Sequence, residues 1–237
     1  MTPKQFKDEC AIHGLEVSEG QLARVDAYYN FLVQENEKMN LTAITKEEDV
    51  YEKHFFDSLL PSFDAEIKGK VLDVGSGAGF PGMVLKIAYP EIDMTLLDSN
   101  GKRISFLEQL ITLLKLDGVR TILGRAEDFT SKNREVFDVV TARAVAPLPI
   151  LFELCAPAVK KEGHFLAMRG SRGLEEIEEA AKAYKTLGFL APIIKIQELD
   201  EGKRILLDYK KDRGTPNMYP RPYAQIKKRP LWRMLLK

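Results

Sequence analysis

The sequence contains little cysteine and little histidine. Its two cysteines, Cys10 and Cys155, lie far apart among 237 residues and form no C-x-x-C pair. This spacing argues against a disulfide framework or a zinc site, and it is typical of a reducing compartment. The three histidines are isolated from one another, so they indicate no ligand cluster, and we expect no metal.

The chain also lacks net charge and long apolar runs. Its 35 Lys and Arg residues balance 35 Asp and Glu residues, so any nucleic-acid surface must be a local basic patch. No apolar run approaches the ~20 residues needed to span a bilayer. The charged start MTPKQFKDEC lacks the apolar segment of a signal peptide. We therefore expect a cytoplasmic protein, monomeric and without a membrane partner.

The spacing of apolar residues divides the chain into two parts. In residues 1–62 a capping box, SEGQ at 18–21, precedes apolar residues at helical spacing, which predicts an N-terminal helical extension. Residues 63–237 alternate strands with helices and end in a basic, proline-rich tail. The predicted strands are 70–74, 94–98, 119–123, 136–142 and 164–168, followed by a hairpin over 190–199 and 203–210. The predicted fold is α/β, a doubly wound, mostly parallel seven-stranded sheet with an antiparallel edge hairpin.

A glycine-rich turn, VLDVGSGAGFPG at 71–82, follows the first of these strands. Glycines let a backbone turn sharply and approach a ligand, and a helix that begins behind them directs N–H groups at it. The spacing of Gly75, Gly77 and Gly79 is G-x-G-x-G, whereas a dinucleotide site requires G-x-G-x-x-G. Asp73, at the strand end, suits a positively charged, amine-bearing ligand better than a pyrophosphate. Both features disfavour a dehydrogenase.

Polar residues also follow the next three strands. Asp98 ends the second strand, where a carboxylate can accept hydrogen bonds from both ribose hydroxyls. GRAEDF at 124–129 follows the third strand and is predicted to be a loop that contacts a base. TARAV at 141–145 follows the fourth. Because open α/β sheets bind ligands at the carboxyl ends of their strands, these segments predict one nucleoside-binding crevice.

The whole pattern resembles the class I S-adenosylmethionine-dependent methyltransferases. More narrowly, NLTAI, HFFDSL, DVGSGAGFPG, LLDSNGKR, GRAED, TARAVAPL and YPR resemble the bacterial small-subunit ribosomal RNA methyltransferase G family, also called glucose-inhibited division protein B, from about residue 36 to 230. The resemblance implies a Rossmann-like methyltransferase fold and S-adenosyl-L-methionine as cofactor. It also implies 16S rRNA of the small ribosomal subunit as substrate, methylated at N7 of one guanine. One departure is Arg169-Gly170, where the family commonly has Lys-Gly.

The resemblance also assigns residues to the cofactor. Gly75 and Phe80 are expected at its methionine end, Asp98, Ser99 and Asn100 at the ribose, Ala126 and Glu127 at the adenine, and Arg143 beside it at the crevice mouth. With the glycines of the turn, the expected set is Gly75, Gly77, Gly79, Phe80, Asp98, Ser99, Asn100, Ala126, Glu127 and Arg143. No catalytic residue is predicted, because guanine N7 carries a free lone pair and needs no general base.

Contact with RNA is expected from local positive charge. Arginine commonly pairs with guanine O6, and basic residues bind phosphates regardless of sequence. The candidates are Arg125, Arg169, Arg172 and Arg221. The tail adds Lys227, Lys228, Arg229 and Arg233, with Tyr219, Tyr223 and Trp232 as aromatic rings that could stack on bases. A solvated surface explains the basic run as well as RNA contact does, and a core position is favoured for Trp232.

Two residues of a second helix predicted in the N-terminal extension, over residues 45–61, have simpler interpretations. His54 lies on the apolar stripe of that helix, which favours a packed residue over a catalyst. Asp57 follows three residues later, at the spacing of a helical pair with His54.

Two other functions use the same fold. A methyltransferase for a small molecule or a protein would have a closed apolar pocket in place of clustered arginines. A non-catalytic ribosome-binding protein would not need Gly75, Asp98 and Glu127, and all three are present.

Overall fold

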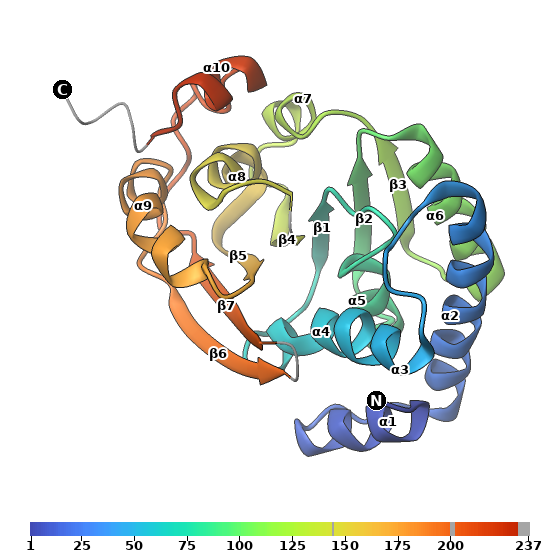
Figure 1. Cartoon of the computed structure of the whole chain (residues 1–237). Coiled ribbons are helices and arrows are strands. Elements are labelled where there is room, and N and C mark those ends of the chain that lie inside the picture. Colours follow the sequence, from blue (N-terminus) through green and yellow to red (C-terminus); the bar gives the residue numbers. More distant parts are fainter. Residues whose placement is uncertain (144, 200–201, 232–237) are drawn as a thin grey trace.

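The computed structural model describes residues 1–143, 145–199 and 202–231. Its centre is one seven-stranded sheet with helices on both faces (Figure 1). The strands are β1 Lys70–Val74, β2 Asp93–Asp98, β3 Val119–Leu123, β4 Phe137–Arg143, β5 Val159–Arg169, β6 Ile193–Leu199 and β7 Gly202–Lys210. Their order is β3-β2-β1-β4-β5-β7-β6, parallel from β3 to β5, with β7 antiparallel to both of its neighbours. The predicted fold and edge hairpin are confirmed.

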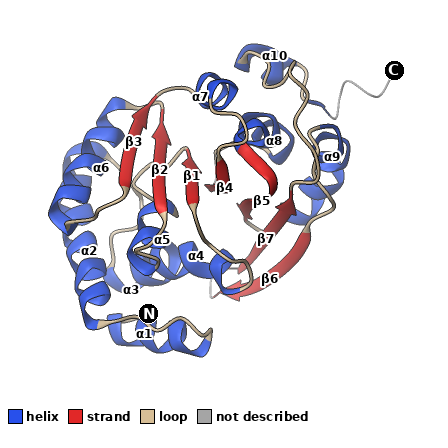
Figure 2. Cartoon of the chain, turned by 180° about the vertical axis from the view of Figure 1, so that it is seen from behind, coloured by secondary structure: helices blue, strands red, loops and turns tan. Residues whose placement is uncertain are grey.

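Helices cover the two faces of this sheet and form two apolar cores (Figure 2). One core joins the N-terminal helices, α5 Gly82–Ala88 and α6 Gly101–Leu114 to the sheet. The other joins α8 Leu148–Cys155 and α9 Gly173–Thr186 to its opposite face. One further helix, α7 Ala126–Lys132, begins within the segment predicted to be a loop, so that prediction was wrong. The first core fixes the N-terminal helices beside the carboxyl edge of the sheet.

The N-terminal segment contains α1 Pro3–Ile12 and α2 Glu19–Met39, and Ser18 and Gln21 form the predicted capping box. A continuous helical run follows, composed of α3 Glu47–Val50, a π-helix Tyr51–Phe56, α4 Asp57–Leu59 and a 3-10 turn Leu60–Phe63. π-Helical turns are rare and frequently occur at functional sites. This one contains His54 and leads directly into Asp57, and both side chains reach the carboxyl edge of the sheet.

The basic tail folds back onto α8 and ends in α10 Tyr223–Lys228. Glu153 of α8 is fully buried and accepts hydrogen bonds from the Arg221 guanidinium at 2.6 and 2.7 Å. Arg134 donates to the Tyr219 carbonyl at 2.7 Å. Trp232 and Arg233 lie outside the described residues. Among the helices that the structure describes, none is long and apolar enough to cross a membrane.

Candidate active site

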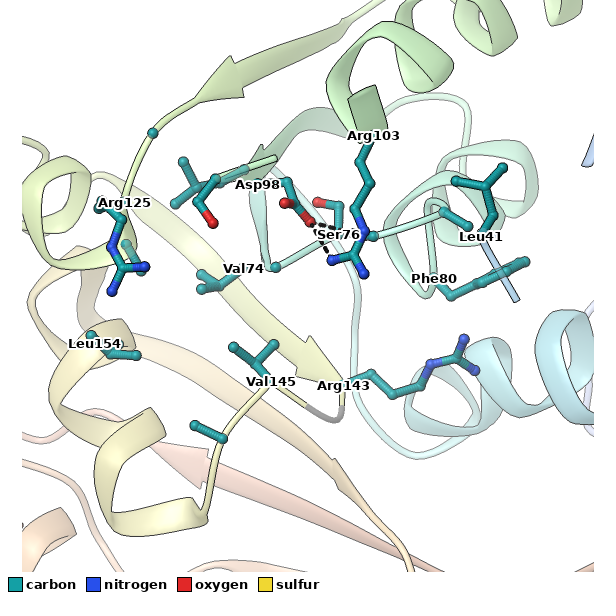
Figure 3. A pocket seen from close by; sticks show the side chains of 18 of the residues that line it. Leu41, Val74, Ser76, Phe80, Asp98, Arg103, Arg125, Arg143, Val145 and Leu154 are labelled. Atoms are coloured by element: carbon teal, nitrogen blue, oxygen red, sulfur yellow. Dashed lines mark hydrogen bonds and ion pairs between the residues drawn. The ribbon is translucent and has the colours of Figure 1, made fainter. Parts of the chain in front are cut away.

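A cavity of about 480 Å³ lies at the carboxyl ends of β1, β2 and β4 (Figure 3). It is lined by Leu41, Thr42, His54, Val74, Gly75, Ser76, Gly77, Ala78, Phe80, Leu97, Asp98, Ser99, Arg103, Gly124, Arg125, Ala126, Glu127, Arg143, Val145, Ala146, Leu154 and Tyr223. Eight of the ten residues predicted to bind cofactor are among them, and Gly79 and Asn100 are not. We call this space the first cavity.

The glycine turn forms the floor of the first cavity. The N–H groups of Gly75 and Ser76 donate to the Leu97 carbonyl at 2.8 and 3.1 Å, which joins the turn to the end of β2. Gly75 has φ +73°, and a Cβ there would lie 2.6 Å from Cγ2 of Val145, so this position requires glycine. Gly79 has φ +98° and faces away from the cavity, because a Cβ on it would lie 2.6 Å from the Tyr28 hydroxyl.

Asp98 is the buried carboxylate of the first cavity. Its Oδ2 accepts the Gly77 N–H at 2.9 Å and its Oδ1 accepts the Asn100 N–H at 2.8 Å. Only 4% of the residue is exposed, yet each oxygen keeps a second lone pair for a ligand. Arg103, which the sequence analysis missed, lies 3.5 Å from Oδ2. Asn100 instead caps α6 by accepting the Lys102 N–H at 2.9 Å.

Glu127 and Arg125 form a second polar side of the first cavity. Arg125 Nε lies 3.1 Å from Oε1 of Glu127, in the first turn of α7. The Arg125 guanidinium also lies over the ring of Tyr223, with Cζ 4.5 Å from the ring centroid. Since Tyr223 belongs to α10, the C-terminal tail contributes one wall of the first cavity.

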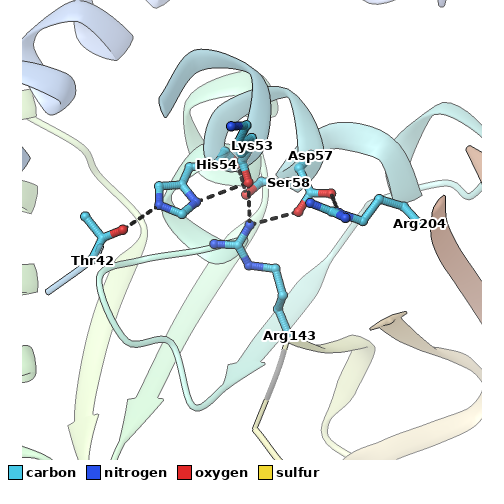
Figure 4. A network of polar contacts seen from close by, with 7 residues as sticks. All are labelled: Thr42, Lys53, His54, Asp57, Ser58, Arg143 and Arg204. Carbon is cyan, nitrogen blue, oxygen red and sulfur yellow. Dashed lines mark hydrogen bonds and ion pairs between the residues drawn. The ribbon is translucent and has the colours of Figure 1, made fainter. Parts of the chain in front are cut away.

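Arg143 joins β4 to the N-terminal helices (Figure 4). Its Nη1 donates to Asp57 Oδ2 at 2.9 Å and to the Lys53 carbonyl at 3.4 Å. Arg204 of β7 donates from Nε to Asp57 Oδ1 at 2.8 Å. The helical spacing had suggested a pair between Asp57 and His54. In the structure Asp57 pairs instead with two arginines.

His54 packs flat on Phe80, with the ring centroids 4.6 Å apart. Its Nδ1 lies 3.1 Å from the Lys53 carbonyl, which can only accept, so Nδ1 carries the proton. Its Nε2 then accepts the Thr42 hydroxyl at 2.7 Å. Burial, with the positive charge of Arg143 next, lowers the pKa of His54 to about 4. The ring is therefore neutral at physiological pH, and it packs on Phe80 while also lining the first cavity.

Known proteins resemble this chain over nearly its whole length. Residues 21–204 match the family described as rRNA small subunit methyltransferase G. The chain belongs to this family. It is 46% identical over 237 residues to ribosomal RNA small subunit methyltransferase G of Geobacillus kaustophilus, covering 98% of this chain and 100% of that one. It is also 46% identical over 236 residues to the same-named protein of Staphylococcus aureus, covering 98% and 99%.

Solved structures support the fold of this methyltransferase family. A SAM-dependent methyltransferase from Aquifex aeolicus matches with a TM-score of 0.53 and 13% identity, covering 72% of this chain and 96% of that one. M. jannaschii TYW2 in complex with AdoMet also matches with a TM-score of 0.53, with 17% identity and coverage of 66% and 74%. The chain is thus an enzyme of the methyltransferase class on a Rossmann-like fold.

The arginines predicted to contact RNA occupy different environments in this methyltransferase. Arg169 donates to the Ala146 carbonyl at 3.0 Å and pairs with Glu176, and Arg221 pairs with buried Glu153, so both guanidinium groups are held inside the protein. Arg125 lines the first cavity. Arg172 is 81% exposed, with Glu175 at 3.5 Å. Arg169 also lines a second cavity beside the first, where its buried Nε has no hydrogen-bond partner within the described chain, and Arg125 and Arg172 are the more exposed candidates.

Asp73, predicted to suit a cationic ligand, does not line the first cavity. Its Oδ2 accepts the Gly82 N–H at 3.0 Å, which ties β1 to the first turn of α5. Its Oδ1 is buried and has no hydrogen-bond partner within the described chain. Burial raises the pKa of this carboxyl to about 7. Its visible role is to join the glycine turn to the helix behind it.

Proposed function

We propose that the chain transfers the methyl group of S-adenosylmethionine to N7 of one guanine in 16S rRNA of the small ribosomal subunit. We propose further that it works in the cytoplasm as a monomer. Membership of the rRNA small subunit methyltransferase G family supports the reaction and the substrate class. The single observation that supports the cofactor site is the buried Asp98 carboxylate, which is held by two backbone N–H groups and lines a 480 Å³ cavity.

The residues of the first cavity fit S-adenosylmethionine. Asp98 offers free lone pairs to the two ribose hydroxyls, and Ala126, Leu97 and Leu154 offer an apolar slot for adenine. Gly75 and Phe80 lie at the other end, where the methionine part would extend. The volume lies within the usual range for small-molecule sites, roughly 300–1,000 Å³. The assignment of Gly77, Ser99, Glu127 and Arg143 to the cofactor belongs to the same proposal.

For this reaction the protein mainly has to position the guanine and the cofactor relative to each other. When bound, S-adenosylmethionine supplies an electrophilic methyl group. Guanine N7 attacks through its free lone pair, so no side chain has to remove a proton. His54, held neutral and hydrogen-bonded at both nitrogens, is not needed as a base. Rate enhancement then comes from holding the two reacting atoms in line, which is worth ~7 kcal/mol or more in well-oriented systems.

The proposal is tested by incubating the protein with labelled S-adenosylmethionine and either 30S particles or naked 16S rRNA. The expected result is one labelled N7-methylguanine, located by nuclease mapping. The comparison of the two substrates shows which of them the enzyme accepts. Label found in a small molecule or a protein, with none in RNA, would overturn the proposal and support the alternative substrates.

A further inference from the structure

A second cavity, of about 350 Å³, lies beside the first. His54 and Arg143 line both, so these two side chains form a shared wall. Behind the wall lies Phe80, stacked on His54, with Arg143 Cζ 4.9 Å from its ring centroid. The second cavity therefore opens next to the end of the first cavity that we assign to the methionine part of the cofactor.

The second cavity has apolar faces suited to a flat ring. Ile44 comes from the segment before α3, Met168 from β5 and Leu206 from β7. Met168 and Leu206 are register partners on the neighbouring strands β5 and β7. Such a pair offers a surface on which an aromatic base can pack, and the volume is in the range of small-molecule pockets.

The polar groups of the second cavity are mainly hydrogen-bond donors. Arg143 and Arg204 both lie against Asp57, the one carboxylate among the described lining residues, and its side chain is only 5% exposed. Arg204 uses Nε for this contact and is 25% exposed. Its two Nη groups make no hydrogen bond to the rest of the described chain. They are donors available to a ligand, in a cavity of excess positive charge.

We propose that the second cavity receives the acceptor guanine and that Arg204 donates to its O6. This proposal rests on the proposed function. A guanine inserted with its ring against Met168 and Leu206 would present O6 to a donor, while N7 must point past the edge of the shared wall toward the first cavity, where the methyl group would lie. Arginine is the commonest partner of guanine O6. A donor at O6 from Arg204 holds the base without occupying the N7 lone pair.

Asp57 acts in this arrangement as a positioning residue. Its two oxygens hold Arg143, at the shared wall, and Arg204 next to each other, at 2.9 and 2.8 Å. A paired guanidinium has one orientation, so its remaining donors point in a fixed direction. Because the target base must leave its RNA stack to enter such a pocket, a preformed donor array lowers the cost of capturing it.

The test compares Arg204→Ala and Arg204→Lys with Lys203→Ala. Lys203 precedes Arg204 on β7, so its side chain points to the opposite face and its loss removes the same charge from the same strand. We expect Arg204→Ala to lower kcat/KM for the RNA at least about 10-fold, as loss of one base contact does. Arg204→Lys should recover part of this loss. Affinity for S-adenosylmethionine, measured by calorimetry, should stay within about 2-fold of the unmodified protein.

A substrate lacking O6 separates base reading from general RNA binding. When 2-aminopurine replaces the mapped guanine, the methylation rate of the unmodified protein should fall. The rate of Arg204→Ala, already low with guanine, should not fall further. If Arg204→Ala behaves like Lys203→Ala, or discriminates against 2-aminopurine as strongly as the unmodified protein, the inference is wrong. Failure of the unmodified protein to label RNA would instead overturn the proposed function.

A second variant does not depend on the Asp57 contacts. A Cβ added to Gly170, at the mouth of the second cavity, would meet nothing within 4 Å, and the same is true of Gly20 in α2. Gly170→Trp should therefore fold, bind S-adenosylmethionine normally and lose methyl transfer to RNA, whereas Gly20→Trp should keep it. Full RNA methylation by a folded Gly170→Trp protein would contradict the placement of the base.

Discussion

The two cavities meet at one wall but are held together by different kinds of contact. The first cavity is built around the backbone of the glycine turn and the end of β2, which is fixed by the hydrogen bonds of that turn and of Asp98. The second consists of side chains from the N-terminal segment and from strands β4, β5 and β7, of which Arg143 and Arg204 are joined by a single carboxylate, Asp57. The first is therefore a property of the fold, whereas the second depends on one ion-pair cluster.

This difference suits the two ligands that we propose. A cofactor shared by many methyltransferases can be recognised by the strand-end loops that all members of the fold possess. A substrate base needs a site that the fold alone does not supply. Here that site comes from the N-terminal helices and the edge hairpin, which bring Asp57 and Arg204 to the sheet. Breaking each cavity separately should thus separate cofactor binding from RNA methylation.

The largest expected effect comes from breaking the first cavity with Asp98→Ala. Two backbone N–H groups would lose a charged acceptor, each such bond contributing about 1.5–3 kcal/mol, and the ribose would lose its partner. Affinity for S-adenosylmethionine should fall about 100-fold in calorimetry. Asp93→Ala, at the opposite end of β2, is the control. Unchanged affinity in Asp98→Ala would remove Asp98 from the ribose role.

Asp57→Asn breaks the second cavity and should have a smaller effect than Asp98→Ala. Here RNA methylation should fall more than affinity for S-adenosylmethionine does. The amide leaves two largely buried guanidinium groups without their countercharge, which should cost about 3 kcal/mol of unfolding free energy in urea titrations. RNA methylation should fall about 10-fold, while affinity for S-adenosylmethionine should fall less, by about 3-fold, because Arg143 lines both cavities but keeps its contact with the Lys53 carbonyl.

The control for Asp57→Asn is Asp64→Asn. Asp64 also belongs to the N-terminal segment, but it forms one surface pair, with Lys195 at 3.0 Å. Its loss should cost at most about 1 kcal/mol. Equal loss of cofactor affinity and RNA methylation in Asp57→Asn would mean that the two cavities do not act separately.

The first cavity could be predicted from the sequence because its residues lie within successive β-α-β units. In such units the strand ends converge, so Gly75, Asp98 and Arg143 can be placed at one edge from their order alone. The same reasoning cannot fix which side chains face the cavity. Asn100 caps α6 and Gly79 lies against Tyr28, although both belong to the same short segments as residues that line the cavity.

The second cavity could not be predicted, because its contacts are long-range. Asp57 and Arg204 are separated by 147 residues and meet only when the antiparallel hairpin joins the sheet. The π-helix that contains His54 has no signal in the periodicity of the sequence. A count of basic residues also does not show which of them form ion pairs. Arg169 and Arg221 carry the same charge as Arg172, but they pair with Glu176 and Glu153.

The smallest expected effect concerns the wall that the two cavities share, and it appears as a pH dependence of stability. The pKa of His54 is lowered in the folded state from 6.5 to about 4 by burial and by Arg143. The unfolded chain therefore binds a proton that the folded chain excludes, so stability is complete above about pH 6.5 and is lost as the pH falls toward 4. His54→Gln should remove this part of the acid sensitivity between pH 7 and pH 5, as measured by urea unfolding. Thr42→Val removes the hydroxyl that donates to Nε2 but keeps the imidazole and its burial, so most of the pH dependence should remain. If His54→Gln keeps the full acid slope, the wall is not the neutral, desolvated surface that separates the two cavities in this structure.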